Sequence, residues 1–507
     1  MASLKKSAIL LTLLAIVVKL SGFLRESIMT SQFGASHYTD GYIMAFSFIT
    51  LALAMISGGF NNVFLPLYVK NKKEDPKKAE QSANGIMNAT VLIFLVLSVI
   101  GYFIAPYLVP LIFPSAPADT EAIAISITQF FILFISAIAL NGILDSYLQG
   151  RRIFVPSQVS KLVATIMGVV FVLLFSEQWG INSLAYGFIA GTLLGSAIQF
   201  YYLRKSGYHW QPTLKIEKKF GKTLLVLLVP SLLNSVVGQI NMFVNKSFAA
   251  STGLDGVVTY LNNASMLVTI PHAIYGTTIA VIIFTLLSEQ LDNPKKFQST
   301  FFTGMQISFV TLMPIAVGLL LVGEQTLSFI FERGKYTAED THNAYLALVF
   351  YVPMIVTQGL QYIVSRSMYA RGKTAIIFRI SVTTIILNAF LNWLLLKPYG
   401  FTGLALSSSF VSVYYLVVSG FVVYKDFDRS ELFKLLNLIV RVLIPTVIMA
   451  VPLYLLQKFT AITELYSLVQ LMILIPLGAI LYTGGLYVFY KDGFRQLLAI
   501  VKKRKKA

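Results

Sequence analysis

The sequence contains no cysteine, few charged residues, and only four histidines and three tryptophans among its 507 residues. The absence of cysteine excludes disulfide bonds, thiolate catalysis and cysteine-ligated metal from this chain, but it does not define the compartment. The histidines, at positions 37, 209, 272 and 342, are not spaced as metal ligands. We therefore expect no metal ion and no cofactor.

The sequence also lacks the motifs of an enzyme. No glycine-rich phosphate loop and no Ser/His/Asp constellation is visible. The longest polar connection, 204–222, is too short for a catalytic domain. A membrane glycosyl or phosphoryl transferase would need paired acids at a membrane face. Asp426 and Asp428 come nearest, but with Arg429 beside them they are better interpreted as a solvated charge cluster.

Apolar residues dominate the composition. Hydrophobic residues make up 56% of the chain, charged residues 12%, and the mean hydropathy is +0.74. A soluble core of this length could not bury that much apolar surface. Apolar runs of about 20 residues, the length needed to span a bilayer, occur about fourteen times. The sequence thus predicts an all-α integral membrane protein with about fourteen transmembrane helices.

Basic residues are concentrated in alternate connections between these runs. The net charge is +18. Five lysines lie between 70 and 78, six basic residues lie between 204 and 222, and residues 502–506 are KKRKK. By contrast, 30–40, 113–122, 177–182 and 250–256 contain no lysine or arginine. Lysine and arginine favour the cytoplasmic side of a membrane. This pattern predicts that both termini are cytoplasmic, and it explains the charge without nucleic-acid binding.

Three sequence markers occur twice in the same order. Phe33-Gly34-Ala35-Ser36 followed by Asp40-Gly41 reappears as Phe248-Ala249-Ala250-Ser251 followed by Asp255-Gly256, and the difference between 248 and 33 is 215. Tyr147 and Gly150 recur as Tyr369 and Gly372, an offset of 222, and Gly180 recurs as Gly400, an offset of 220. Duplicated halves in a membrane chain are typical of transporters.

An even number of helices in each half makes the repeat parallel, because six spans return the chain to its starting side. We expect a first lobe at 1–221, a second lobe at 222–436, two additional helices at 437–490 and a basic cytoplasmic tail at 491–507. The additional helices could form a lateral groove or a lipid-facing brace. The tail is suited to anionic headgroups, although a topology anchor is the simpler interpretation.

The first apolar run carries a polar stripe. Lys19 falls near the middle of the membrane, where an ammonium group is unfavourable unless it faces water or a partner. Glu26 lies seven residues further on, with Arg25 beside it. These residues predict a hydrated, cationic cavity. For Arg25 and Glu26, an ion pair that locks the helix bundle is an equal alternative. A secretory signal at 1–22 is disfavoured, since no small-x-small cleavage site follows.

Three other polar positions are candidates for the cavity. Asp40, like its counterpart Asp255, precedes a glycine at the start of a helix, where a carboxylate can cap free backbone amides. A cap is favoured for Asp40, with pairing to Arg25 as the alternative. In the repeat, Ile240 lies opposite Arg25, with the neutral polar residues Gln239 and Asn241 beside it, so the positive side of the cavity belongs to the first half. No acidic residue is evident deep within the first twelve helices, away from their ends.

The chain resembles a known family along its first twelve helices. The segments that carry the resemblance are LSGFLRESIMTSQFGASHYTDGY from Leu20, VFLP ending at Pro66, GRRIFVPS at 150–157, FERGKYTAEDT at 331–341, SRSMYARGKT at 365–374 and YGFTGLALSSS at 399–409. They are similar to the MurJ (MviN) lipid II flippases of the multidrug/oligosaccharidyl-lipid/polysaccharide exporter superfamily. The resemblance implies two six-helix lobes around a cationic cavity and two added helices that form a groove for a lipid tail.

The resemblance also implies roles for individual residues. The two basic cavity residues of the family's first helix match Lys19 and Arg25, the first being lysine instead of the usual arginine. The family's acidic residue after the FGA turn matches Asp40. Two further arginines of better-known members are replaced by apolar residues, near Leu53 and Ala54 and at Met266. A smaller cationic set still suits a diphosphate.

The function implied is translocation of the undecaprenyl-diphosphate-linked peptidoglycan precursor, lipid II, across the bacterial cytoplasmic membrane by alternating access. The expected partners are this lipid-linked saccharide, membrane lipids and proteins of cell wall synthesis, without nucleic acid. Two alternatives stay open: a flippase for another lipid-linked glycan, of capsular, teichuronic or exopolysaccharide type, and an ion-coupled drug exporter. A scaffold for envelope enzymes is a third class, and it would tolerate loss of every cavity charge.

Overall fold

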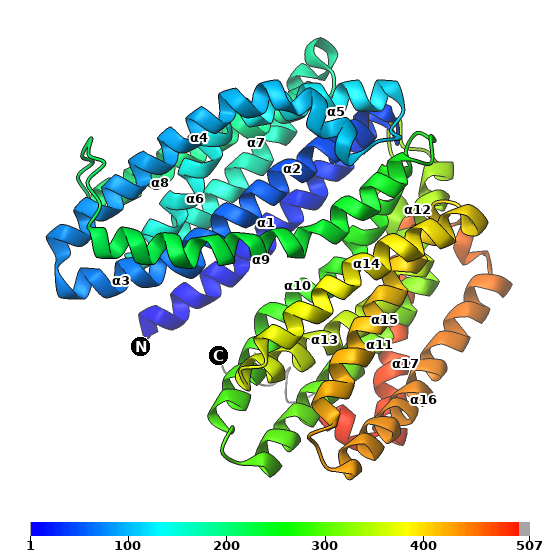
Figure 1. Ribbon diagram of the computed structural model, residues 1–507. Coiled ribbons are helices and arrows are strands. Elements are labelled where there is room, and N and C mark those ends of the chain that lie inside the picture. The colour runs from blue at the N-terminus through cyan, green and yellow to red at the C-terminus, as the bar shows by residue number, and fades with distance from the viewer. Residues whose placement is uncertain (1, 496–507) are drawn as a thin grey trace. The chain divides into compact units, whose positions relative to one another are not determined.

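The computed structural model describes residues 2–495, apart from the side chains of residues 2–9, 12, 57, 234 and 273–282. Every regular element in the described part is a helix (Figure 1), so the all-α prediction is confirmed. The helices are α1 (Ala2–Phe33), α2 (His37–Gly59), η1 (Phe60–Phe64), α3 (Leu65–Glu74), α4 (Pro76–Ile112), α5 (Ala118–Leu133), α6 (Ile135–Gly150), α7 (Val155–Trp179), α8 (Asn182–Lys205), α9 (Lys218–Ala250), α10 (Val257–Glu289), α11 (Pro294–Phe331), α12 (Ala338–Tyr351), α13 (Pro353–Ala370), α14 (Thr374–Tyr399), α15 (Thr402–Tyr424), α16 (Arg429–Phe459), η2 (Ala461–Glu464) and α17 (Ser467–Phe489).

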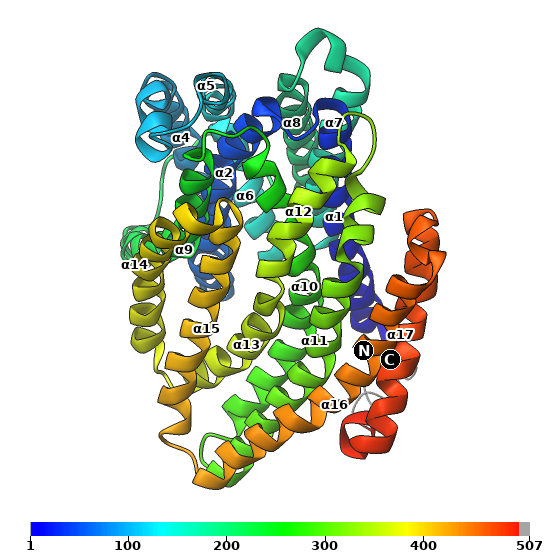
Figure 2. The ribbon, with the colours of Figure 1, turned by 90° about the vertical axis from the view of Figure 1, so that its right-hand side faces the viewer.

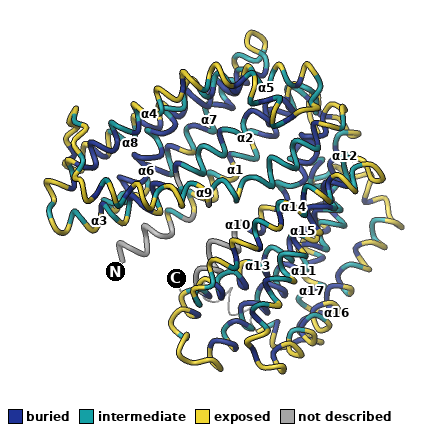
Figure 3. Tube along the Cα trace, in the orientation of Figure 1, coloured by how far each residue is buried: buried dark blue, intermediate teal, exposed yellow. Residues whose placement is uncertain are grey.

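The lengths of the helices suit a membrane. Among the described residues, ten helical spans are long and apolar enough to cross a bilayer, or twelve if each of the bent pairs α5/α6 and α12/α13 counts as one span. Helices α1 and α10, of 32 and 33 residues, include side chains outside the described set. The ten to twelve spans of the described residues are roughly consistent with the predicted number of about fourteen. One side of α4 exposes large apolar side chains, as expected for a lipid-facing helix (Figure 3).

The backbone repeats with the sequence. Helices α5 and α6 meet at Phe134 with a bend of 55°, and α12 and α13 meet at Val352 with a bend of 41°. The two bends are 218 residues apart. Gly180 and Gly400, which differ by 220, both have positive φ angles, 54° and 58°, just before α8 and α15. The same breaks therefore occur at equivalent places in both halves.

One sequence marker has a different register from the one expected. The Tyr147 and Tyr369 pair predicts an offset of 222, whereas α6 and α13 end at Gly150 and Ala370, an offset of 220. At this offset Arg152, with φ 63°, is equivalent to Gly372, with φ 71°. Both positions follow a helix and need a left-handed conformation that favours glycine. The match between Tyr147 and Tyr369 is therefore a coincidence, and these two residues do not occupy equivalent positions.

The chain divides into two compact units. Unit 1 contains residues 1–259 with 333–336, and unit 2 contains 260–332 with 337–507. Helix α9 packs along α2 within unit 1. The boundary at 221/222 follows the sequence repeat, whereas the compact units follow the contacts in space. The two boundaries differ, and the division into lobes stays a prediction about the duplication.

Small residues bring α7 and α8 together in unit 1. Gly187, Gly191 and Gly195 recur at intervals of four along α8, on the face toward α7. A Cβ on Gly191 would lie 2.6 Å from the Cα atom of Ala164, and one on Gly195 would lie 3.0 Å from the Cα atom of Ser160. Small residues at this spacing allow two helix backbones to approach closely in a membrane.

In unit 2, the last two long helices lie against α11 (Figure 2). The Tyr482 hydroxyl donates to the Val310 carbonyl at 2.7 Å, which joins α17 to α11. The Gln457 amide donates to the Leu321 carbonyl at 2.9 Å, which joins α16 to α11. Both carbonyls lie within α11, upstream of or next to its non-helical residue Val322. Helices α16 and α17 are therefore anchored elements of unit 2.

Candidate functional site

The polar stripe of α1 contains an enclosed ion pair. The Arg25 guanidinium donates to a Glu26 carboxylate oxygen at 2.5 Å, and the two side chains are 13% and 5% exposed. The guanidinium also lies 4.4 Å from the ring centre of Phe46 on α2. An Arg side chain stacked on an aromatic ring and paired with a carboxylate is held in one orientation.

This arrangement matches the alternative in which Arg25 and Glu26 lock the bundle. The positive charge of Arg25 is balanced by its neighbour, and Asp40, the other proposed partner, is engaged elsewhere. Loss of either member would leave the other buried without its counter-ion. The role of the two residues in substrate binding stays a prediction.

Lys19 lies on the exposed part of α1. Its side chain is exposed on unit 1, and it forms no hydrogen bond or ion pair with any residue in the described part of the chain. An uncompensated ammonium group in the middle of a membrane helix requires water or an anion. The role of Lys19 in ligand binding stays a prediction.

A cation on α9 faces α2. The Lys246 ammonium donates to the Ser47 hydroxyl at 2.8 Å, and it lies 3.4 Å from the Ile43 carbonyl. Lys246 is therefore held against α2. The predicted residues Gln239 and Asn241 lie on the same helix, and both are partly buried. Helix α9 thus contributes polar side chains to unit 1, in addition to those of α1.

Asp40 is a helix cap, but for a different helix from the one predicted. Its carboxylate, buried in the first turn of α2, accepts hydrogen bonds from the backbone amides of Gly256 and Thr259 at 2.9 Å each. It also accepts a hydrogen bond from the Thr259 hydroxyl at 2.6 Å. These amides belong to the start of α10, where a carboxylate satisfies free donors and favours the helix dipole. Asp40 therefore joins the first half of the chain to the second.

Two more contacts surround this cap. The Thr39 and Thr259 hydroxyls lie 3.0 Å apart, and the two residues differ by 220, the offset of the repeat. Asp255, the sequence counterpart of Asp40, is about half exposed, and one of its oxygens lies 3.4 Å from the His37 ring. The two aspartates therefore have different roles: the first is a buried cap, and the second is a surface group.

A turn from the FERGKYTAEDT segment adds to the same region. The Lys335 amide donates to the Ser31 carbonyl at 2.8 Å, at the end of α1. Gly334 has a φ angle of 62°, and a Cβ there would lie 2.2 Å from the Ser31 carbonyl oxygen. Only glycine allows both this conformation and this approach. We call these contacts, from Ser31, Thr39 and Asp40 to Gly256, Thr259 and Lys335, the α1–α2 clasp.

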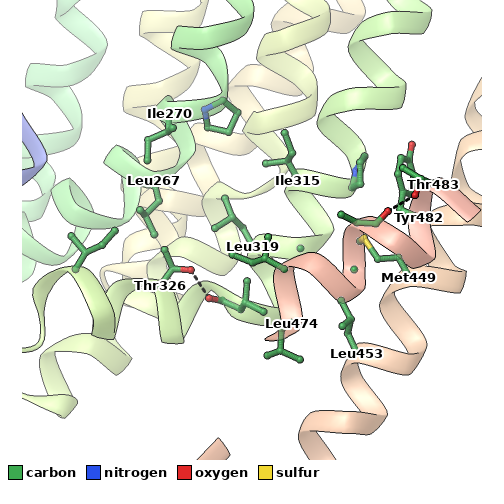
Figure 4. A pocket seen from close by; sticks show the side chains of 18 residues that line it. Leu267, Ile270, Ile315, Leu319, Thr326, Met449, Leu453, Leu474, Tyr482 and Thr483 are labelled. Atoms are coloured by element: carbon green, nitrogen blue, oxygen red, sulfur yellow. Dashed lines mark hydrogen bonds between the residues drawn. The ribbon is translucent and has the colours of Figure 1, made fainter. Parts of the chain in front are cut away.

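Unit 2 contains an apolar groove between α10, α11, α16 and α17 (Figure 4). Its volume is about 460 Å³. The labelled side chains of Leu267 on α10, Leu319 on α11 and Leu474 on α17 line it together with Leu453 on α16. Gly318 also lines it, and a Cβ there would meet nothing within 4 Å. The last two long helices thus build one side of a groove suited to a hydrocarbon chain.

Two acids of unit 1 are buried. Glu26, a predicted site residue, is 4% exposed, and Asp145, which was not predicted, is 3% exposed and lies five residues before the end of α6. Asp145 pairs with Lys161 at 3.2 Å. Each acid thus has a basic partner, which lowers the cost of burying it. Within the described residues, no three His, Asp or Glu side chains form a group that could hold a metal ion.

The fold has counterparts among solved structures. It is similar to a structure described as lipid II flippase MurJ in an inward closed conformation, with a TM-score of 0.79, 23% identity and coverage of 96% of this chain and 99% of that one. It is also similar to an inward-facing MATE multidrug resistance transporter of the MOP superfamily, with a TM-score of 0.70, 13% identity and coverage of 83% and 95%. The chain thus has the fold of this class of multi-pass membrane transporters.

The family follows from the sequence comparison. The family model described as lipid II flippase MurJ matches residues 29–476, and the chain belongs to this family. A probable lipid II flippase MurJ of Buchnera aphidicola subsp. Acyrthosiphon pisum is 25% identical over 92% of this chain and 94% of its own length. The lipid II flippase MurJ of Burkholderia cenocepacia is 25% identical over 77% and 78%. The resemblance seen in the sequence segments is confirmed.

Proposed function

We propose that this protein is a lipid II flippase, which moves the undecaprenyl-diphosphate-linked peptidoglycan precursor across the bacterial cytoplasmic membrane. The observation that carries the proposal is the match of residues 29–476 to the lipid II flippase MurJ family model. This range includes the clasp residues and most of the apolar groove, whereas Lys19, Arg25 and Glu26 precede it. The protein accordingly acts as a transporter and not as an enzyme.

The groove in unit 2 supports a substrate with a long apolar tail. Its lining is almost wholly apolar, and it is bounded by α16 and α17, the helices outside the repeat. A hydrocarbon chain gains nothing from leaving the bilayer unless a groove offers close packing. We propose that the groove holds part of the undecaprenyl chain while the headgroup crosses. A drug exporter would not require a groove for a polyisoprenoid chain.

Lys19 supports recognition of the diphosphate. Among the described side chains of α1 it is an exposed cation, whereas the charge of Arg25 is matched by Glu26. A lysine ammonium binds phosphate as a compact point charge. We propose that Lys19 attracts the diphosphate and that Arg25 and Glu26 hold the helix in position. Gln239 and Asn241 are proposed as neutral polar contacts for the saccharide.

The α1–α2 clasp supports alternating access. It joins residues of the first half to the start of α10 and to the 333–336 turn of the second half. Every contact in it is a hydrogen bond that water could replace if the two halves separated. We propose that the clasp closes the outer side of the transporter in this conformation and opens in the other. Two of the segments that form it, 30–40 and 250–256, contain no lysine or arginine.

The proposed orientation has both termini in the cytoplasm, as the basic connections indicate. The absence of cysteine allows a direct test, because each introduced cysteine is the single thiol of the chain. In intact cells, an impermeant thiol reagent should label Leu254→Cys, in the connection without basic residues, and should not label Lys215→Cys until the membrane is opened. The reverse labelling would contradict this orientation.

The function is tested by reconstitution with defined lipid-linked donors. Vesicles are loaded in one leaflet with lipid II, with an undecaprenyl-diphosphate-linked capsular or teichuronic-type glycan, or with a labelled phospholipid, and headgroup access from the other side is measured. We expect transfer of lipid II only. Transfer of the other glycan alone would replace the substrate proposal, and transfer of none would contradict it. Association with cell wall synthesis proteins is a related proposal, testable by cross-linking in cells.

A further inference from the structure

A second cavity in unit 2 lies where α11, α16 and the end of α17 meet. Its volume is about 520 Å³, and it is lined by Phe302, Gln306, Lys434, Asn437, Leu438, Arg441, Tyr490, Asp492 and Arg495. Three of these side chains are basic and one is acidic. The proposed function uses none of them. We call this cavity the basic pocket.

One wall of the basic pocket is a buried polar contact, and its cations, including Arg441, lie on the exposed side. The Gln306 amide donates to the Tyr490 hydroxyl, and these side chains, 7% and 6% exposed, join α11 to the end of α17. The Arg441 guanidinium donates through Nε to the Asn437 amide oxygen at 3.1 Å and lies 5.9 Å from the Tyr490 ring centre. The pocket is thus a formed site in which Arg441 is oriented by neutral neighbours.

The charges of the pocket are only partly balanced. Lys434 pairs with Glu431 at 2.6 Å, and Arg495 lies 4.0 Å from Asp492. No carboxylate of the described residues lies within 4.0 Å of Arg441. An arginine on a membrane helix with no counter-ion is unfavourable unless an anion or the headgroup region compensates it. Arg441 therefore marks the position at which an external anion would be most favourable.

The basic pocket is aligned with the apolar groove. Equivalent lining residues are eight positions apart: Gln306 and Pro314 on α11, Arg441 and Met449 on α16, and Tyr482 on α17 and Tyr490 directly after its end. Eight residues of helix correspond to about 12 Å. An anionic group and a hydrocarbon chain are therefore accommodated one above the other, in the order in which a membrane lipid presents them.

We propose that the basic pocket binds the phosphate group of a membrane lipid whose hydrocarbon chain enters the apolar groove. Basic pockets between transmembrane helices are a recognised mode of phospholipid headgroup binding. The ligand is a phosphate ester that carries an apolar chain, and two kinds of membrane lipid provide such a group. One is an anionic bilayer phospholipid that fills the site at rest. The other is the diphosphate of the lipid-linked substrate, held here before it reaches Lys19, and this version rests on the proposed function.

The test measures lipid retention by the purified full-length protein with native mass spectrometry. Phosphatidylglycerol, undecaprenyl diphosphate and zwitterionic phosphatidylethanolamine are added separately and in competition. We expect Arg441→Gln to lower retention of the phosphate-bearing anionic lipid about five-fold, the factor for about 1 kcal/mol per basic residue. Arg441→Lys should retain most of the binding, because it keeps the charge. Arg379→Gln, which removes an exposed cation from α14 outside the pocket, is the matched control and should change nothing.

The outcomes separate the two sources. Displacement of phosphatidylglycerol by undecaprenyl diphosphate in the unmodified protein, but not in Arg441→Gln, would identify substrate loading. Retention of phosphatidylglycerol without such displacement would identify a bilayer lipid. Equal retention of anionic and zwitterionic lipids, or equal effects of Arg441→Gln and Arg379→Gln, would overturn the proposal. Because lipid retention is measured without transport, a failure here is distinct from a failure of lipid II transfer.

Discussion

The Arg25 and Glu26 pair gives a sharp test of whether the polar residues of α1 bind substrate or hold the helix. Arg25→Met removes the guanidinium and leaves Glu26, which is 4% exposed, without its counter-ion. The double variant Arg25→Met with Glu26→Gln removes both charges and keeps similar side-chain sizes. We expect the single variant to be strongly destabilised and the double variant to recover most of the stability.

The magnitude follows from the distance in the pair. At 2.5 Å, Coulomb's law with an effective dielectric constant of about 20 gives about 7 kcal/mol of attraction. Much of this offsets the desolvation of the two charges. Removing one partner of a buried pair typically costs about 3–5 kcal/mol, whereas replacing both with neutral groups is often close to neutral. The single variant should therefore differ from the double variant by several kcal/mol.

The assay combines thermal unfolding in detergent with lipid II transfer in vesicles. If Arg25 holds the helix, the double variant unfolds near the temperature of the unmodified protein and transfers lipid II. Equal loss of stability in the single and double variants would refute the reasoning about the pair. A stable double variant without transfer would show that Arg25 or Glu26 contacts the substrate directly, as the family resemblance implies.

Three other predictions concern separate parts of the molecule. Lys19→Met should abolish complementation of a flippase-depleted strain and Lys19→Arg should not, since only the latter keeps the charge; normal growth with Lys19→Met would remove Lys19 from the mechanism. Gly334→Ala should destabilise the protein more than Gly372→Ala. Both substitutions add about 1–2 kcal/mol of left-handed backbone strain, but only the Cβ at position 334 would meet the Ser31 carbonyl oxygen, at 2.2 Å. Equal melting temperatures of the two variants would contradict the clasp geometry. Gly318→Leu should fill the groove and lower lipid II transfer without loss of stability, and unchanged transfer would exclude the groove from chain binding.

The fold could be predicted from the sequence because membrane helices leave a strong local signal. Apolar runs and alternating basic connections depend on neighbouring residues and on the bilayer, not on distant contacts. The repeat was visible because equivalent breaks need equivalent residues, as at Gly180 and Gly400. The offset at Tyr147 was wrong, since one residue match does not fix a register where Arg152 takes the place of a glycine.

The site was less predictable because its contacts join distant segments. A carboxylate near a helix start indicates a cap, and this was correct for Asp40, but the helix it caps begins more than 200 residues later. No local pattern identifies that partner. The same holds for Lys246, which donates a hydrogen bond to Ser47 on α2, 199 residues earlier in the chain. The basic pocket likewise combines residues of three helices that no sequence window contains.

The most direct test of alternating access is a reversible lock on the α1–α2 clasp. The Thr39 and Thr259 oxygens are 3.0 Å apart, so Thr39→Cys with Thr259→Cys should form a disulfide, whose sulfur atoms lie about 2.05 Å apart, after a small adjustment, in a chain with no other thiol. The measurement is lipid II transfer by vesicles of this variant before and after reduction. Our account predicts no transfer when the pair is oxidised and full recovery when it is reduced. Undiminished transfer by the oxidised protein would contradict it.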